Sequence, residues 1–444
     1  MATLIRPFKR NTEEDYLDSV FDITKWINSF SVKKSKGKAW KLSSGEGSSE
    51  GDQLAAKLND RTIYSGAAGI GYFYVQLYEI TGDKKYLAEA ILAGEYLIDT
   101  FDEELGNKPG IHTGLAGEGY FAELLYKKTN DKRFRDYAIK TAETIYEKAH
   151  KDENGIYWNG IYDYMGDGSA INYWLFIYDI TKDSKYLDYA KQGIDYIITL
   201  KTYEDDKEAY WKFFDMHDYF ETIPAGGIVS NFAHGTSGIV YILTKYYEAS
   251  KEQYYLDLAK KGFTFLKRIA IDTEDASIVP YIYYEDPNKT FDVYYLSLCH
   301  GPVGTGVVVN ELYKATGDEE YKEYFDRFSN ALIDAGVDSK RSAGYWNDCV
   351  CCGSSGVLLH FVTGYKNTGN EKYKDYAIRI ADKLIGDAFK DDKGTRWYNA
   401  WTRVIPWNVD SHLGLYIGSA GSASALLSLY AAIKGIELTG LYEF

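Results

Sequence analysis

A short motif of the form Gly-x-x-Gly, followed by an apolar and aromatic stretch, recurs along this chain from residue 66 onward. Seven copies are recognisable, and their first glycines lie 48 to 67 residues apart. The third copy is degenerate, because Ile171 replaces its second glycine. Repeats of this period are typical of helical arrays in which each unit buries its apolar face on its neighbours. The first glycines are Gly66, Gly114, Gly168, Gly235, Gly301, Gly353 and Gly418.

A second signature follows each of the first six copies. It is a polar turn that leads into an amphipathic stretch, as in Thr81-Gly-Asp-Lys-Lys-Tyr86. Apolar residues in 86–98 recur at the helical spacing i, i+3/i+4 and i+7, whereas residues 70–78 are apolar nearly all round. A helix that is apolar on every side belongs in an interior. Each unit therefore predicts one interior helix and one surface helix.

These units predict an all-α fold, an α/α toroid of seven helical hairpins with an inner and an outer ring of helices. An open solenoid is the alternative arrangement of such repeats. The glycine motifs favour the closed form, because they place bare backbone at the start of every inner helix, at one end of the ring. That end is the expected functional face, since glycine permits close backbone approach. The long loops at 205–230 and 281–296 are expected to carry specificity.

The N-terminal residues differ from the repeats. Residues 11–30 predict one helix with Thr12 as its N-cap and acidic residues in its first turn. Residues 31–53 are rich in Lys, Ser and Gly, which predicts a flexible linker. We therefore expect residues 1–55 to form a helix plus linker, and residues 56–444 to form the single toroid domain.

Composition excludes several classes of function. A net charge of -15 argues against a nucleic-acid partner, which requires a basic face. Four cysteines in 444 residues are too few for a disulfide framework, and their clustering indicates metal binding or catalysis in a reducing compartment. The chain shows no signal-peptide pattern and no run of eighteen apolar residues, so a cytoplasmic protein without a transmembrane segment is expected.

Cysteines stand directly before the repeat glycines at two consecutive copies. Cys299 precedes Gly301 by two residues, and Cys351 and Cys352 precede Gly353. Three thiolates suit a zinc ion and leave its fourth tetrahedral position open for an incoming thiol, whose pKa the ion would lower. The alternatives are a fourth ligand from His300, or cysteines that serve only as small buried apolar side chains. The latter interpretation is the better one for Cys349, which has no matching repeat position.

Polar side chains stand near the same position of other repeats. His234 occupies the position equivalent to Cys352, and an imidazole beside a metal-bound thiolate suits acid/base work. Asp163 would orient or polarise a group at the rim, although an Asp before glycines is as often a turn or cap residue. His112 lies one step out of register and is expected to be structural or to contact substrate. His300 and Tyr295 are further candidates for substrate contact.

The successive motifs His234-Gly-x-x-Gly, Cys299-His-Gly-x-x-Gly and Cys351-Cys-Gly-x-x-Gly resemble those of the lanthionine synthetase C-like family, the cyclases of lanthipeptide biosynthesis. The resemblance covers roughly residues 60–440. It implies an α/α toroid with a central zinc held by Cys299, Cys351 and Cys352. It also implies addition of a peptide cysteine thiol to dehydroalanine or dehydrobutyrine to form a thioether ring. His234 would be the acid/base histidine and Asp163 the aspartate of the site, and the substrate would be a dehydrated precursor peptide.

Two departures from the family pattern are visible. The third zinc ligand of stand-alone cyclases is usually histidine, but Cys352 stands there in this chain, as in the cyclase domains of some bifunctional synthetases. Tyr295 replaces an arginine that some members carry four residues before the first cysteine. The chain has no room for a dehydratase domain, so dehydration would fall to a separate protein.

Other functions remain open at this point. A member of the same fold could bind or conjugate a small thiol such as glutathione at its zinc. A carbohydrate-active α/α barrel could use the 43 tyrosines and nine tryptophans to stack sugars, with Asp163 and Asp167 as acid/base groups, but would leave three cysteines unexplained. A pure interaction solenoid would hold no metal.

Overall fold

The computed structural model of this chain describes residues 9–41, 60–339, 347–400 and 409–444. Its contacts divide the chain into two compact units. The first unit comprises Met1–Phe101, Leu124–Phe134 and Leu332–Phe444, and the second comprises Asp102–Glu123 and Arg135–Ala331.

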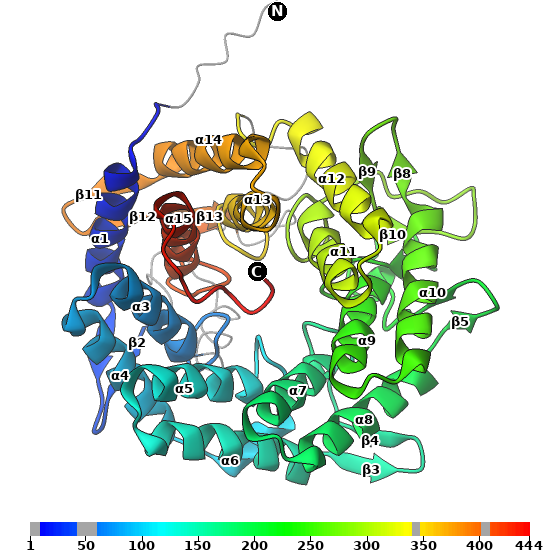
Figure 1. Cartoon of the computed structure of the whole chain (residues 1–444), viewed down its shortest axis with the longest axis horizontal. Helices are drawn as coiled ribbons and strands as arrows, with labels where there is room; N and C mark the ends of the chain where they lie inside the picture. The colour runs from blue at the N-terminus through cyan, green and yellow to red at the C-terminus, as the bar shows by residue number, and fades with distance from the viewer. Residues whose placement is uncertain (1–8, 42–59, 340–346, 401–408) are drawn as a thin grey trace, which may run out of the picture. The chain divides into compact units, whose positions relative to one another are not determined.

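Helical hairpins follow one another along both units, as the repeats predict. The first helix of a hairpin packs on the next helix in the sequence in the pairs α3 with α4, α7 with α8, α9 with α10 and α13 with α14. In the second unit α9 also packs on the first helices of its neighbours, α7 and α11 (Figure 1). The first helices of the hairpins are α3 (Ala67–Thr81), α5 (Leu115–Thr129), α7 (Ala170–Thr181), α9 (Thr236–Ser250), α11 (Pro302–Thr316), α13 (Ser354–Thr368) and α15 (Ser419–Lys434). The second helices are α4 (Lys84–Asp99), α6 (Lys132–Lys148), α8 (Ser184–Thr199), α10 (Gln253–Ile269), α12 (Glu319–Asp334) and α14 (Glu371–Asp387).

Burial follows the predicted difference between the two helices of a hairpin. Every residue of α3 from Ala67 to Leu77 is buried. In α10, by contrast, the buried residues recur at helical spacing along one face. The first helices are therefore interior elements, and the second helices cover them.

The glycines of the motif are required by the loop that precedes each first helix. A side chain at Gly301 would bring its Cβ closer than 3.0 Å to the carbonyl oxygen of Tyr295, and one at Gly304 would do the same to Leu298. In both cases the obstructing carbonyl lies six residues earlier in the chain. The loop thus folds back tightly onto the helix start, where only glycine fits. Gly353 and Gly356 meet the carbonyls of Asn347 and Val350 in the same way.

The N-terminal helix α1 (Glu13–Ser29) begins at the predicted N-cap. Thr12 and Asp15 form a capping box, in which each side chain accepts a hydrogen bond from the other residue's backbone N–H. The helix packs against α15, the first helix of the seventh repeat, which has no second signature after it in the sequence. Asp382 of α14 fixes its start by accepting from the Asn11 N–H at 2.9 Å and from the Tyr16 hydroxyl at 3.3 Å. Helix α1 thus takes the place of a missing seventh partner.

The prediction of a flexible linker is wrong for residues 31–40, which form an antiparallel hairpin of β1 (Ser31–Lys33) and β2 (Lys38–Trp40). Gly37 turns the chain with a φ of +80°, where glycine is favoured. Trp40 is buried and stacks on Tyr74, with 6.2 Å between ring centroids. An apolar anchor therefore outweighs the polar composition of this segment. Residues 42–53 of the predicted linker lie outside the described residues.

Short antiparallel strand pairs lie in the loops between hairpins. The pair that bears on function is β7 (Ile228–Val229) with β10 (Ile282–Tyr283), because it ties together the two long loops of the second unit. The other pairs are β3 (His150–Asp152) with β4 (Gly155–Tyr157), β5 (Tyr203–Glu204) with β6 (Ala209–Tyr210), β8 (Ile271–Asp272) with β9 (Ser277–Ile278), β11 (Phe389–Asp391) with β12 (Gly394–Arg396), and β13 (Asn399–Ala400) with β14 (Val409–Asp410). The described residues also contain three 3-10 helices, η1 (Glu103–Asn107), η2 (Asp167–Ser169) and η3 (Met216–Asp218).

Within the described ranges, none of the helices is both long enough and apolar enough to cross a membrane.

Candidate functional site

Backbone hydrogen bonds join the loops that precede the first helices of the second unit. The Met165 N–H donates to the carbonyl of Ala233, and the Ala233 N–H donates to the carbonyl of Cys299, each at 2.9 Å. Ala233 and Cys299 both stand two residues before the first glycine of their repeat. The next residues, His234 and His300, lie with their ring centroids 5.3 Å apart. Equivalent positions of consecutive repeats are thus neighbours in space, as the sequence predicts.

His234 and Asp163 form a hydrogen-bonded pair. The Nδ1 atom of His234 lies 2.8 Å from Oδ2 of Asp163. The Asp163 side chain is 1% exposed, whereas that of His234 is 33% exposed. An ionised carboxylate can only accept hydrogen bonds, so Nδ1 carries the proton, and in the neutral ring Nε2 is then the basic atom. Both residues are sequence-predicted candidates, and the structure brings them together.

The loop of the degenerate third repeat holds Asp163 rigidly. Its Oδ1 atom accepts from the Gly166 N–H at 2.7 Å, and its carbonyl accepts from the Gly168 N–H at 3.0 Å. Asp167 follows on η2 and accepts from the Gly160 N–H at 2.8 Å. Burial raises the pKa of Asp167 to about 6, and the nearby charge of Asp163 adds to the increase. The turn function expected of an Asp before glycines and the pairing with His234 are therefore combined in Asp163.

An aromatic group surrounds His300. Its ring centroid lies 4.6 Å from that of Tyr281 and 5.6 Å from that of Tyr295. His300 and Tyr295, both predicted to contact substrate, are thus brought together next to His234. His112 is fully buried and packs edge-on against Tyr164 at 5.5 Å, which favours its structural interpretation.

The corresponding loops of the first unit carry the cysteine pair. The Cys351 N–H donates to the carbonyl of Tyr416, and the Tyr416 N–H donates to the carbonyl of Tyr64, each at 2.9 Å. These three residues also stand two positions before a repeat glycine. The rings of Tyr64 and Tyr416 are stacked, with centroids 5.8 Å apart and planes within 7°. The sequence singled out neither tyrosine as functional, although both occupy the repeat position of the cysteines.

Tyr64 lies close to the cysteines of this loop. Burial raises the pKa of Tyr64 well above its usual value, and the cysteines, Cys351 foremost, raise it further. The tyrosine is therefore a neutral hydroxyl at any physiological pH. Cys349 is buried and its sulfur accepts from the Cys352 N–H at 3.4 Å, so it helps to shape the loop, in agreement with the packing role expected for it.

Cys299 of the second unit and Cys351 and Cys352 of the first unit are the predicted metal ligands, and each offers one sulfur atom. Cys299 and Cys351 are buried and Cys352 is partly exposed. None of the four cysteines is in a disulfide. Three thiols are a donor set that suits zinc, because thiolate is among its preferred ligands and a tetrahedral ion then retains one open position. The residues present therefore fit the predicted cofactor.

A buried ionic network supports the cysteine loop. The sequence did not indicate this network. Lys383 of α14 is 1% exposed; its Nζ lies 3.7 Å from Asp348 and donates to Ser354 at 3.1 Å and to Asp387 at 2.7 Å. The Ser354 hydroxyl in turn donates to Asp348 at 3.0 Å. The carbonyl of Asp348 accepts from the hydroxyls of Ser355 and Ser422. The segment directly before Cys349 is thus anchored to three helices.

The hairpin repeats and their glycine-bound loops define an α/α architecture, and comparison with solved structures identifies its class. A solved structure of nisin cyclase is 16% identical to this chain with a TM-score of 0.65, over 88% of this chain and 94% of that one. This likeness confirms the predicted all-α fold, an α/α toroid. A family model of the lanthionine synthetase C-like proteins matches residues 57–435. The chain therefore belongs to the lanthionine synthetase C-like family.

Carbohydrate enzymes share the fold more distantly. A sugar epimerase from a ruminal bacterium is 14% identical with a TM-score of 0.51, over 96% of this chain and 100% of that one. The cellobiose 2-epimerase of Bacillus thermoamylovorans is 12% identical with a TM-score of 0.50, over 94% and 98% of the two chains. These likenesses extend to the fold alone. A search of curated proteins finds no match.

Proposed function

We propose that this protein is a zinc-dependent lanthionine synthetase, which adds a peptide cysteine thiol to dehydroalanine or dehydrobutyrine and so closes a thioether ring. The observation that carries the proposal is the hydrogen-bonded pair of His234 and Asp163, in which His234 stands in a loop of the same design as the loops that present Cys299 and Cys351-Cys352. Membership of the lanthionine synthetase C-like family supports the same reaction.

Cys299, Cys351 and Cys352 would hold the zinc ion, which when bound supplies a positive charge that lowers the pKa of an incoming thiol. With three cysteine ligands, one position of the ion is left for substrate. Tyr64 and the Asp348–Lys383 network would keep Cys351 and Cys352 in place, as residues around the ligands of a metal commonly do.

His234 is proposed to move the proton that the addition requires. The substrate thiol loses its proton as its sulfur bonds to the β-carbon of the dehydroamino acid, and the α-carbon gains a proton as the double bond is lost. Asp163 holds His234 through Nδ1, so that Nε2 can accept one proton and donate it again. Atoms and charges balance without an oxidant or a second substrate.

The substrate of this reaction is a dehydrated precursor peptide. Its dehydroamino acids arise by loss of water from serine or threonine, so we propose that a separate dehydratase acts before this protein. Free thiol ligands require reducing surroundings, which favours a cytoplasmic location.

The direct test uses a synthetic peptide that contains one dehydroalanine and one cysteine. Ring closure leaves the peptide mass unchanged but removes the free thiol, so the product no longer reacts with an alkylating reagent. We expect the zinc-loaded protein to close the ring, and His234→Gln to retain zinc while losing activity. Cys349→Ser is the matched control, because this residue is outside the proposed ligand set and a hydroxyl can still accept from the Cys352 N–H, so the variant should keep both properties.

A zinc-loaded wild-type protein that leaves the peptide thiol intact would contradict the proposal. In that case glutathione and a dehydroalanine peptide should be supplied together, since a small-thiol conjugating enzyme would join them between two molecules. Rapid conjugation without ring closure would assign the protein to that alternative.

A further inference from the structure

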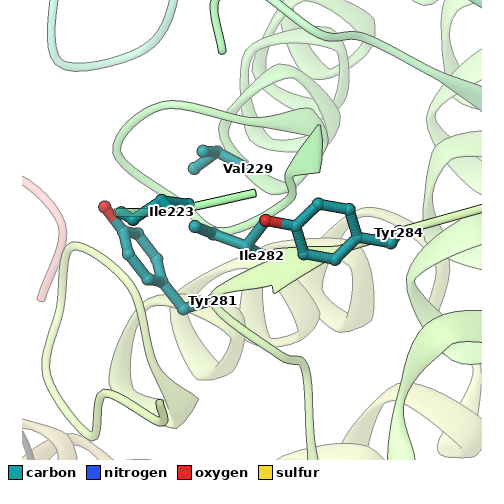
Figure 2. Close-up of a cluster of buried hydrophobic side chains, with 5 residues drawn as sticks. All are labelled: Ile223, Val229, Tyr281, Ile282 and Tyr284. Carbon is teal, nitrogen blue, oxygen red and sulfur yellow. The ribbon is translucent and has the colours of Figure 1, made fainter. Parts of the chain in front are cut away.

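The two long loops of the second unit form a compact aromatic lobe, defined here as residues 214–229 and 281–295. Strands β7 and β10 pair the loops in antiparallel register, Ile228 opposite Tyr283 and Val229 opposite Ile282. The Tyr284 hydroxyl donates to the carbonyl of Pro224 at 2.7 Å. The lobe has its own buried core, which Figure 2 shows: Ile223, Val229, Tyr281, Ile282 and Tyr284. A lobe with such a core presents its surface residues in fixed positions.

One part of the lobe surface borders the candidate histidines. Phe214, Met216, Phe291 and Tyr295 pack on the lobe core but are only partly buried. The Phe214 ring lies edge-on to His234, 5.7 Å between centroids, and the Tyr295 ring lies 5.6 Å from His300. Partly exposed aromatic rings therefore lie next to the residue proposed to move the proton.

The outer rim of the lobe is apolar and acidic. Tyr219 and Phe220, at the end of η3, are 60% and 37% exposed, and Tyr219 packs edge-on against Phe214. Exposed large aromatic rings that continue from a site are a common sign of an interaction surface. The exposed carboxylates of the rim exceed its one exposed lysine, Lys289, even when Glu285 is left out because it pairs with Arg268 at 3.4 Å; the others are Asp218, Glu221, Asp286 and Asp292. Such a rim attracts positive charge.

We propose that the aromatic lobe is the substrate-selecting surface of this protein, and that it takes a bulky apolar side chain of a cationic peptide beside the reacting dehydroamino acid. Phe214 and Tyr295 receive the apolar side chain next to His234, and Tyr219 and Phe220 extend this contact toward the acidic rim. The inference rests on the proposed cyclase function, to which it adds the chemical class of the peptide. Burying one large apolar side chain changes affinity by about tenfold or more.

Binding can be measured without ring closure, using labelled peptides in which alanine replaces the cysteine. Four peptides suffice, with phenylalanine or serine next to the dehydroalanine and with two lysines or two glutamates farther along. Fluorescence anisotropy on the zinc-loaded wild type should show the phenylalanine–lysine peptide binding at least about tenfold more tightly than the serine–lysine peptide. Exchange of the lysines for glutamates should weaken binding, and added salt should reduce that difference.

Two variants locate the preference in the lobe. Phe214→Ala should abolish most of the preference for phenylalanine. Tyr219→Ser combined with Phe220→Ser should reduce it severalfold, and it perturbs folding least because both side chains are exposed. The matched control is Tyr254→Ser on α10, which removes an aromatic ring that is 52% exposed outside the lobe, and it should leave the preference unchanged.

Equal binding of the phenylalanine and serine peptides by the wild type would overturn the inference, as would an unchanged preference in the Tyr219→Ser, Phe220→Ser variant. Ring closure is measured separately on peptides that retain their cysteine. If the ring closes but the binding preference does not depend on the lobe, only the proposed role of the lobe is refuted. If the preference depends on the lobe but no ring closes, only the proposed cyclase function is refuted.

Discussion

The His234 loop and the Cys351–Cys352 loop share one backbone design and carry different chemistry. In each, the residue two positions before the glycine donates its N–H to the carbonyl of the equivalent residue in the next repeat. In each, a Cβ on either of two glycines would lie closer than 3.0 Å to the carbonyl oxygen of the residue six positions earlier, so a side chain does not fit. Ala233-His234 occupies the two positions in one loop and Cys351-Cys352 in the other. The roles proposed for the two loops, proton transfer and metal binding, therefore differ by two residues per repeat while the backbone design stays the same.

The largest effect is expected when the proposed proton-transfer residue is replaced while the proposed metal ligands are left intact. His234→Gln should lower ring closure by about 100- to 10,000-fold, the usual contribution of an acid/base group, because glutamine cannot carry the proton. Zinc content should stay at the wild-type value, since the side chain is outside the ligand set. Elemental analysis alongside the thiol-alkylation assay checks both. Loss of zinc in this variant would mean that the two loops do not have separate roles.

A side chain at a motif glycine should disturb the backbone design that the two loops share. Gly353→Ala places a Cβ against the Asn347 carbonyl and should lower the free energy of unfolding by about 3 kcal/mol, as overpacking does. Gly369→Ala is the control, because this C-cap glycine at φ +68° has open space around it. Its substitution should lower the free energy of unfolding by about 1 kcal/mol, the cost of a left-handed backbone for alanine. Urea unfolding of both variants measures the difference. Equal losses would show that the loop tolerates a side chain.

The link between Asp163 and His234 can be weakened without removing either side chain's shape. Asp163→Asn replaces an acceptor by a group that can also donate, so the imidazole is no longer held in one tautomer. Ring closure should fall about 10- to 100-fold, as for other partners that orient a functional histidine. The zinc content is the internal control. An activity within twofold of wild type would remove Asp163 from the account.

The smallest effect concerns Asp167 and depends on pH. Its raised pKa of about 6 means that the folded protein holds this proton more tightly than the unfolded chain. Stability from this group therefore falls as pH rises from about 4 to 6, and the cost persists above pH 6. Asp167→Asn should be about 3 kcal/mol more stable than wild type at pH 7, and within about 0.5 kcal/mol of it at pH 4. Urea unfolding at both pH values checks this, and a constant difference would exclude titration as its cause.

Local sequence signals predicted the helical repeats and pointed to the candidate residues of their loops. The glycines, the helical periodicity and the cysteines near Gly301 and Gly353 are visible within short windows, so the hairpins and the ligand candidates followed from them. Asp163 and His234 were each predicted, but their pairing spans 71 residues and needed the folded chain.

Long-range packing accounts for what the sequence did not reveal. Helix α1 replaces the missing partner of α15, although nothing within residues 13–29 indicates where the helix packs. The hairpin at residues 31–40 is held by Trp40 on Tyr74, a contact that outweighs a linker-like composition. Lys383 lies 29 residues from Ser354, and no motif marks it as a support of the cysteine loop.

The most direct test of the account is zinc per chain, measured by elemental analysis on reduced wild type and on Cys351→Ala combined with Cys352→Ala. We expect about one zinc in the wild type and none in the variant, because two of the three proposed ligands are lost. Retention of zinc by the variant, or its absence from the wild type, would contradict a metal site built from these repeat positions.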